Sequence, residues 1–369
     1  MTIYLLIPII IIIVGIGANS IKTSNSRKMM FLCVALFIPF FVAGYRSVDI
    51  GTDTLNYVNF FIKASYSRLK DMYAYRYREE FEIGFALLCF IIGRFTKDVH
   101  IFLLVISFLT NVLMGIAIFR NSKRVFMPAL LYILVGSFVH NMTALRQGLA
   151  LAIVLNAFFY YKKQEYIKYS VIILVASLIH SFSIVFLGMI FLPRLITNRK
   201  RLILISVMVG SGLLFTLDLV HIVVLKWLPH YDYYFRHNWN SGQRFGVRSL
   251  VMVLVDMIVV LVLISRIDKT PTKGFSVLED RRRIMVFYTV VLVAGATSLI
   301  MMPRFGIYER CFRFFNAFLI FAIPEVMEYI KIPTNRFIIG SAVIAGGLVY
   351  YIYTLAVDPY NIVPFMLYT

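Results

Sequence analysis

The sequence is short of charged residues. Only 15% of its 369 residues are charged, whereas a soluble domain carries about a quarter. Hydrophobic residues make up 60% of the chain and the mean hydropathy is +0.83. Too little polar surface remains to cover a water-soluble globule, so the composition predicts an integral membrane protein.

Cysteine is also scarce. Cys33, Cys89 and Cys311 lie far apart, each within or beside an apolar run, and no CxxC pair occurs. This pattern excludes a disulfide scaffold and gives no zinc site, so we interpret all three as small apolar residues. His230 and His237 match no known metal-binding spacing.

Several common catalytic motifs are missing as well. The chain contains no HExxH, no Walker A loop, no GxSxG and no dinucleotide fingerprint. It also lacks the soluble domain expected of an enzyme that uses nucleotide sugars. We therefore expect neither a metal nor a cofactor.

Acidic residues number 18 against 37 lysines and arginines, which gives a formal charge of +19. The basic residues form short clusters between apolar runs. That placement is typical of membrane topology and does not indicate nucleic-acid binding.

The apolar runs predict an all-α fold, a polytopic transmembrane helical bundle. A crossing needs about 20 apolar residues, and paired segments can be shorter, so we expect about 12 spans within a range of about 11 to 14. The expected spans are 3–19, 29–45, 99–119, 125–140, 147–161, 165–180, 181–193, 202–226, 248–265, 284–302, 311–330 and 337–356.

The basic clusters set the orientation. Placing all of them in the cytoplasm leaves four stretches outside: 46–81, 141–146, 227–247 and 303–310. A full crossing at 82–95 would invert every later loop, so we predict a re-entrant or interfacial helix there.

We therefore expect a single integral membrane domain over 1–369. Its first extracytoplasmic loop, 46–98, includes the re-entrant or interfacial helix, and 227–247 forms the second. A cytoplasmic loop is expected at 266–283. Aromatic residues crowd both outer loops, where they can form an interfacial belt or stack on sugar rings.

The first outer stretch opens with a charged turn that runs from Arg46 to Thr54. Arg46 offers a planar fork suited to phosphate, while Asp49 and Asp53 can accept hydrogen bonds from sugar hydroxyls or act as a base. Gly51 suits a tight turn. The alternative is an Asx-type turn in which Arg46 only anchors the interface.

Two further arginines face the same side in this topology. Arg146 begins an apolar span, where an arginine at membrane depth costs about 2.5–3.5 kcal/mol unless it has a partner. It can bind an anion such as pyrophosphate or extend to the lipid headgroups. Arg310 lies in a cluster with Arg304 and Arg313, and with Arg46 and Arg146 it would complete a cationic basin for a diphosphate.

His180 separates two short apolar segments. A histidine at membrane depth can serve as a base, a proton relay or a hydrogen-bonding hub. The alternative is a structural histidine bonded to backbone at a helix break.

Taken in order, these stretches resemble the EpsG family and related Wzy-type polymerases of bacterial surface polysaccharides. Each motif is weak alone, but the ordered set over roughly residues 45–185 is more specific. The motifs are Arg46-Ser…Gly51-Thr-Asp53-Thr…Tyr57, Glu82-Ile-Gly-Phe, Leu145-Arg146-Gln147-Gly-Leu-Ala and Ala176-Ser-Leu-Ile-His180-Ser.

The resemblance implies an enzyme of the bacterial cytoplasmic membrane whose active site faces outward. Such a polymerase joins oligosaccharide repeat units carried on undecaprenyl diphosphate, without nucleotide sugar or metal. Its expected partners are the lipid-linked donor and acceptor, the bilayer, a flippase and a chain-length regulator.

Roles for individual residues follow from the resemblance together with their chemistry. The expected ligands of the diphosphate are Arg46, Arg146 and Arg310. The expected bases or acceptor-positioning groups are Asp53, Glu82 and His180. The expected sugar contacts are Asp49 and Tyr57.

Two other functions stay open. A flippase of the same lipid-linked unit would also need many helices and a cationic interior, although the sequence has no internal repeat. A membrane-bound acyltransferase that modifies the polymer would need a histidine-led site on the cytoplasmic side, whereas His180 is expected outside.

Overall fold

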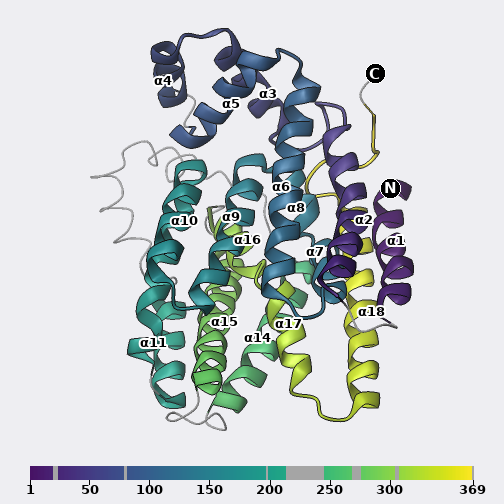
Figure 1. Cartoon of the computed structure of the whole chain (residues 1–369), viewed down its shortest axis with the longest axis vertical. Coiled ribbons are helices and arrows are strands. Elements are labelled where there is room, and N and C mark those ends of the chain that lie inside the picture. Colours follow the sequence, from purple (N-terminus) through teal and green to yellow (C-terminus); the bar gives the residue numbers. More distant parts are fainter. Residues whose placement is uncertain are drawn as a thin grey trace. The chain divides into compact units, whose positions relative to one another are not determined.

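The computed structural model describes residues 1–19, 24–78, 81–196, 198–212, 245–267, 276–303 and 307–367. Over these residues the chain is helical and contains no β-strand, which confirms the all-α prediction (Figure 1). The chain divides into two compact units. The first is Met1–Phe186 with Thr334–Thr369, and the second is Leu187–Pro333.

The first unit contains most of the helices. In chain order they are α1 (Thr2–Asn19), α2 (Asn25–Gly44), α3 (Thr54–Tyr66), α4 (Leu69–Arg78), α5 (Ile83–Phe95), α6 (Val99–Asn121), α7 (Phe126–Leu134), α8 (Ser137–Thr143), α9 (Leu145–Lys162), α10 (Tyr166–Ile179), the start of the 3₁₀ helix η1 (Ser181–Phe191) and, near the C-terminus, α18 (Pro333–Val357).

The longer helices of this unit pack in series. α2 packs on α6, α6 on α9, and α9 on α10 (Figure 1). α6 is buried along one face through Phe102, Leu103 and Ile106, each with no exposed surface. Its first turn is capped by Asp98, whose carboxylate accepts the N–H of His100 at 2.7 Å. Apolar burial therefore holds these helices together, and their ends are satisfied locally.

The predicted outer loop 46–98 is folded into three short helices. α5 packs on α3, α4 and α10, around a core that includes Phe60, Phe81 and Phe85. α5 coincides with the helix predicted near 82–95. Its 13 residues span about 20 Å, well short of a bilayer core of about 30 Å. A re-entrant or interfacial position for α5 stays a prediction.

α7 and α8 form one bent element. They meet at 57° across a short break, and Gly136 in that break has a φ of +80°. Only glycine adopts this conformation without strain, so the bend is encoded locally. The predicted outer stretch 141–146 is mostly helical, since α8 ends at Thr143 and α9 begins at Leu145.

The second unit is also helical. It contains α11 (Leu192–Leu195), α14 (Val247–Ile267), α15 (Ser276–Met301), α16 (Ile307–Asn316) and α17 (Leu319–Glu328). α14 and α16 both pack on α15. Inside this packing the amide of Asn316 donates to the fully buried Asp256 at 3.1 Å.

The expected count of about 12 spans is not confirmed. In the part of the chain that the structure describes, five helices are long and apolar enough to cross a membrane, or six if α7 and α8 form one span. Shorter apolar helices such as α10 account for part of the difference. The physical reason is helix length. A segment of 14 residues such as α10 covers about 21 Å, which is short of a bilayer core of about 30 Å.

The structure describes only part of the predicted hydrophilic loops. Residues 227–244 of the second outer loop lie outside the described residues, as do 268–275 of the cytoplasmic loop. The rest of the cytoplasmic loop is helical, because α15 already begins at Ser276. There Arg283 forms an ion pair with Asp280, one turn earlier, which favours a helix over a loop. The single-domain organisation and the sidedness of these loops stay predictions.

Candidate functional site

Two motif residues that lie 64 positions apart form an ion pair. Arg146, in the first turn of α9, donates from Nη1 to Oε2 of Glu82 at 2.5 Å. Glu82 immediately precedes α5. The two side chains are 15% and 19% exposed, so each is mostly buried but keeps some exposed surface.

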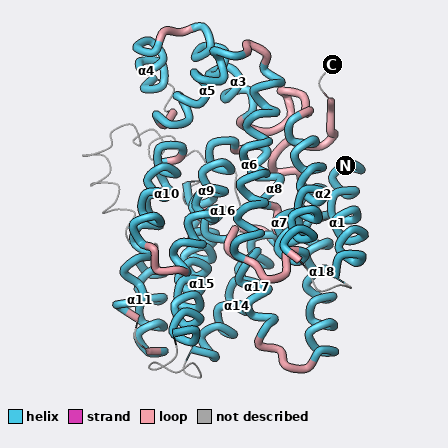
Figure 2. Tube along the Cα trace, in the orientation of Figure 1, coloured by secondary structure: helices cyan, strands magenta, loops and turns pink. Residues whose placement is uncertain are grey.

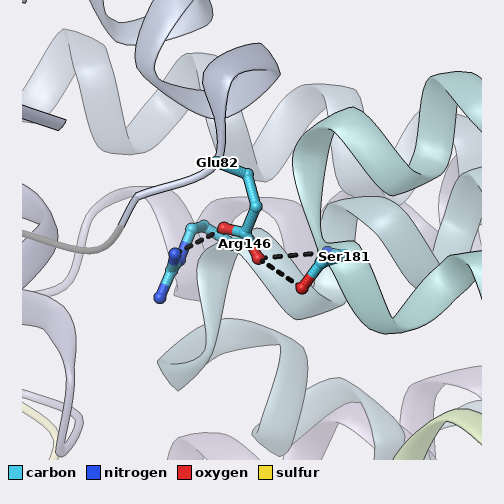
Figure 3. Close-up of polar contacts among 3 residues, drawn as sticks. All are labelled: Glu82, Arg146 and Ser181. Carbon is cyan, nitrogen blue, oxygen red and sulfur yellow. Dashed lines mark hydrogen bonds and ion pairs between the residues drawn. The ribbon is translucent and has the colours of Figure 1, made fainter. Parts of the chain in front are cut away.

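Ser181 holds the other carboxylate oxygen of Glu82. Its backbone N–H donates to Oε1 at 3.0 Å and its hydroxyl donates to the same atom at 3.3 Å. Figure 3 shows the carboxylate between the guanidinium of Arg146 and Ser181. Ser181 directly follows His180, the C-cap residue of α10. The site therefore joins the start of α5, the start of α9 and the end of α10.

The carboxyl group of Glu82 is held in its ionised form. Burial alone would raise its pKa, but the positive charge of Arg146, together with His180 and the N–H of Ser181, outweighs burial. The pKa of Glu82 consequently lies below its ordinary value of 4.5. At neutral pH the site contains a carboxylate that neutralises an arginine.

Aromatic rings support the guanidinium of Arg146. Its central carbon lies 4.4 Å from the ring centroid of Phe81 and 5.8 Å from that of Tyr57. Phe81 stacks in turn on Phe60, with 4.1 Å between ring centroids. Such rings attract a cation and exclude water from one of its faces, so the guanidinium is held in place.

Two glycines allow the helices to approach closely at the site. A Cβ atom added to Gly84 of α5 would lie 2.6 Å from the backbone oxygen of Leu178 in α10. A Cβ atom added to Gly148 of α9 would lie 2.8 Å from Cα of Asn141 in α8. Each glycine is two positions after a site residue, Glu82 or Arg146, so this spacing helps set the geometry of the ion pair.

Arg46 occupies a different environment. Its side chain has no exposed surface, and it donates to the carbonyl of Ala43 and to the carbonyl of Met142 at 2.6 Å. These carbonyls belong to the last turns of α2 and α8, the ends that carry partial negative charge. Burial lowers the pKa of Arg46 to about 10, which leaves it charged at neutral pH.

The cavity beside Arg46 is small. It is lined by Arg46, Asn111, Tyr132 and Asn141 among others, and has room for about one water molecule. A diphosphate cannot enter this space. Arg46 was expected to bind diphosphate. In this structure it is enclosed, and it donates hydrogen bonds to the last turns of α2 and α8.

The comparisons with known proteins give one result. The model of the EpsG family matches residues 28–367, nearly the whole chain. The chain belongs to the EpsG family. Members of that family are Wzy-type polysaccharide polymerases. The comparisons with curated proteins and with solved structures return no match.

The EpsG match extends further than the motifs did. The motifs covered roughly residues 45–185, whereas the match also includes the C-terminal segment 358–367. This irregular segment, which follows α18 in Figure 2, binds the charged turn at 46–54. The N–H groups of Ser47 and Gly51 donate to the carbonyls of Met366 and Asn361 at 2.8 and 2.9 Å. The EpsG match therefore includes both partners of this contact, the turn at 46–54 and the C-terminal segment.

The other predicted residues of the turn are placed as follows. Gly51 has a φ of +100°, which confirms the tight turn. Asp49 is exposed and accepts the hydroxyl of Ser47 at 3.3 Å. Asp53 begins α3 and is half-buried. Tyr57 is 5% exposed beneath Arg146, so its ring supports the arginine more than it offers a surface to sugar.

Arg310 belongs to α16 of the second unit, where it is half-buried. One turn later Arg313 forms an ion pair with Glu309 at 3.1 Å. Arg304 lies outside the described residues. The proposed basin of three arginines stays a prediction.

Sequence reasoning missed two residues of the site, Ser181 and Phe81. Both are direct neighbours of predicted residues, His180 and Glu82, and this adjacency was the available signal. Among the described residues, no three His, Cys, Asp or Glu side chains gather in a way that could hold a metal ion.

Proposed function

We propose that this chain polymerises lipid-linked oligosaccharides on the outer face of the bacterial cytoplasmic membrane. The donor and acceptor are oligosaccharide repeat units carried on undecaprenyl diphosphate, and the product is a surface polysaccharide such as capsule, exopolysaccharide or O-antigen. Membership of the EpsG family supports the reaction class. The single observation that carries the site is the meeting of Glu82, Arg146 and Ser181, drawn from three separate family motifs.

The reaction assigns a task to each group. The bond between the donor's anomeric carbon and its diphosphate oxygen breaks, and negative charge grows on the diphosphate. Arg146 stabilises that charge through its planar fork. The acceptor hydroxyl forms the new bond to the anomeric carbon, and its proton passes to Glu82 or His180.

Arg46 takes a supporting role in this proposal. Its bonds to Ala43 and Met142 hold the ends of α2 and α8, and α9 with Arg146 begins two residues after α8 ends. Asp53 and Asp49 remain candidates for contacts with the acceptor sugar. A flippase and a chain-length regulator are the expected partners in the membrane.

The test is a complementation experiment. The gene is deleted and replaced by wild type, Arg146→Ala, His180→Ala or Glu165→Gln at matched expression, and surface polysaccharide is resolved by length. Glu165 pairs with Lys168 at the opposite end of α10, so it serves as a matched control. We expect the deletion and the first two variants to leave single repeat units, and Glu165→Gln to restore full length.

Two other outcomes would assign a different function. Repeat units trapped on the cytoplasmic face of the deletion strain would identify a flippase. Polymer of normal length that lacks only a substituent would identify a modifying acyltransferase.

A further inference from the structure

Glu82 is bound as an anionic ligand would be. Its two oxygens accept hydrogen bonds from Nη1 of Arg146, the N–H of Ser181 and the hydroxyl of Ser181. Guanidinium, backbone N–H and hydroxyl groups together form a donor set that binds phosphate oxygens as readily as carboxylates. These donors come from α9 and from Ser181, which begins η1 just after α10, and Glu82 brings the acceptor from outside these helices.

We infer that the carboxylate of Glu82 occupies the position of a substrate phosphate, and that the diphosphate of the lipid-linked donor binds Arg146 and Ser181 by displacing it. The inference rests on the proposed function and makes Ser181 a direct ligand of the diphosphate. It also makes Glu82 a competitor of the substrate in the resting protein.

The local structure lets Glu82 leave without loss of the fold. Its side chain makes no capping hydrogen bond to α5, and its backbone is extended with a ψ of 148°. The carbonyl of Glu82 still accepts the N–H of Ala86 at 3.0 Å, so α5 keeps its first turn whichever way the side chain points. Only the side-chain torsions have to change.

The donors, by contrast, are fixed. The rings of Phe81 and Tyr57 hold the guanidinium of Arg146, and the N–H of Ser181 is set by the backbone at the end of α10. A phosphate that replaces the carboxylate satisfies the same donors. The exchange therefore costs little beyond breaking the ion pair, and a diphosphate with one negative charge on each phosphate can replace the single charge of the carboxylate at Arg146.

Displacement also changes the chemistry of Glu82. Beside Arg146 the carboxylate is a weak base, because the arginine stabilises its ionised form. Separation from Arg146 and the approach of a negatively charged diphosphate both raise the pKa of a carboxyl group. Glu82 thus becomes able to take the proton of the acceptor hydroxyl only after the donor has bound, so the base forms in the complex that needs it.

The experiment measures binding of inorganic pyrophosphate to the purified full chain in detergent by calorimetry. Glu82→Gln keeps the shape of the side chain but removes its charge, so we expect pyrophosphate to bind about tenfold more tightly than to wild type. Arg146→Ala is expected to abolish binding, and Glu165→Gln to leave it unchanged. In the Glu82→Gln background, Ser181→Ala is expected to weaken binding several-fold.

Affinity for Glu82→Gln equal to or below that of wild type would overturn the displacement. No effect of Ser181→Ala in that background would overturn Ser181 as a ligand. The wild-type chain gives a second measurement that needs no variant. Pyrophosphate is expected to increase carbodiimide labelling of Glu82, detected by mass spectrometry, and to leave labelling of Glu165 unchanged; unaltered Glu82 labelling would contradict the exchange.

Failure of this inference and failure of the proposed function give different results. Polymer loss in Arg146→Ala cells, combined with no gain of affinity in Glu82→Gln, rejects the displacement alone. Pyrophosphate exchange with Glu82 in a chain whose deletion leaves polymer length unchanged rejects the polymerase and keeps the anion site.

Discussion

Arg46 and Arg146 have the same side chain and were assigned the same ligand from the sequence, yet their surroundings differ. Arg46 has no exposed surface and bonds the carbonyls of Ala43 and Met142. Arg146 is 15% exposed and bonds the carboxylate of Glu82. The greater exposure of Arg146 supports its proposed role as a ligand of the diphosphate, whereas the enclosed Arg46 bonds the ends of α2 and α8.

This difference predicts the effect of Arg46→Ala. The substitution leaves two buried carbonyls without their donor, at about 1–3 kcal/mol each, so we expect a loss of roughly 2–6 kcal/mol in stability. Thermal unfolding of the purified protein measures it, with Arg199→Ala on an exposed position as the control. If Arg46→Ala left the melting temperature unchanged but abolished polymer, Arg46 would be a substrate ligand and not a structural residue.

At the scale of elements, the sequence predicts what depends on local pattern. Apolar runs and the glycine at 51 predict helices and a tight turn, and α5 appears where 82–95 was expected. α3 and α4 were not predicted, because their aromatic and charged residues resemble a loop until they pack on α5. The ion pair of Glu82 with Arg146 could not be predicted either, since only the packing of α5 and α9 on α10 brings them together.

Close helix packing at Gly84 gives a prediction for α5 and α10. In Gly84→Ala the new methyl would meet the backbone oxygen of Leu178, which cannot move away as a side chain would. We expect a destabilisation of about 1–3 kcal/mol and shorter polymer, because the start of α5 and Glu82 must shift. Polymer length and thermal unfolding are both measured. Gly346→Ala, whose Cβ meets no atom within 4 Å, is the matched control and is expected to be silent.

At the scale of the whole molecule, the N-terminal helix α1 and the C-terminal segment of the first unit contact each other. The hydroxyl of Tyr4 in α1 donates to the carbonyl of Ile362 at 3.0 Å, and the segment around Ile362 binds the turn at 46–54. The bond between Tyr4 and Ile362 joins positions 358 apart in the sequence. No local pattern specifies such a pairing, and the family motifs, which lie within roughly residues 45–185, include neither Tyr4 nor Ile362.

The segment itself depends on Asp358, which gives the last prediction. Its carboxylate accepts the N–H groups of Ile362 and Val363 at 2.8 and 2.9 Å, which holds the carbonyls of the segment in place for Gly51. Asp358→Ala removes both bonds, so we expect a loss of about 1–3 kcal/mol locally and faster hydrogen exchange in the peptide that contains Gly51. Asp49→Ala, on the exposed side of the same turn, is the control and should leave exchange unchanged. Unaltered exchange at Gly51 in Asp358→Ala would mean that the turn is stable by itself, and that the C-terminal segment only rests against it.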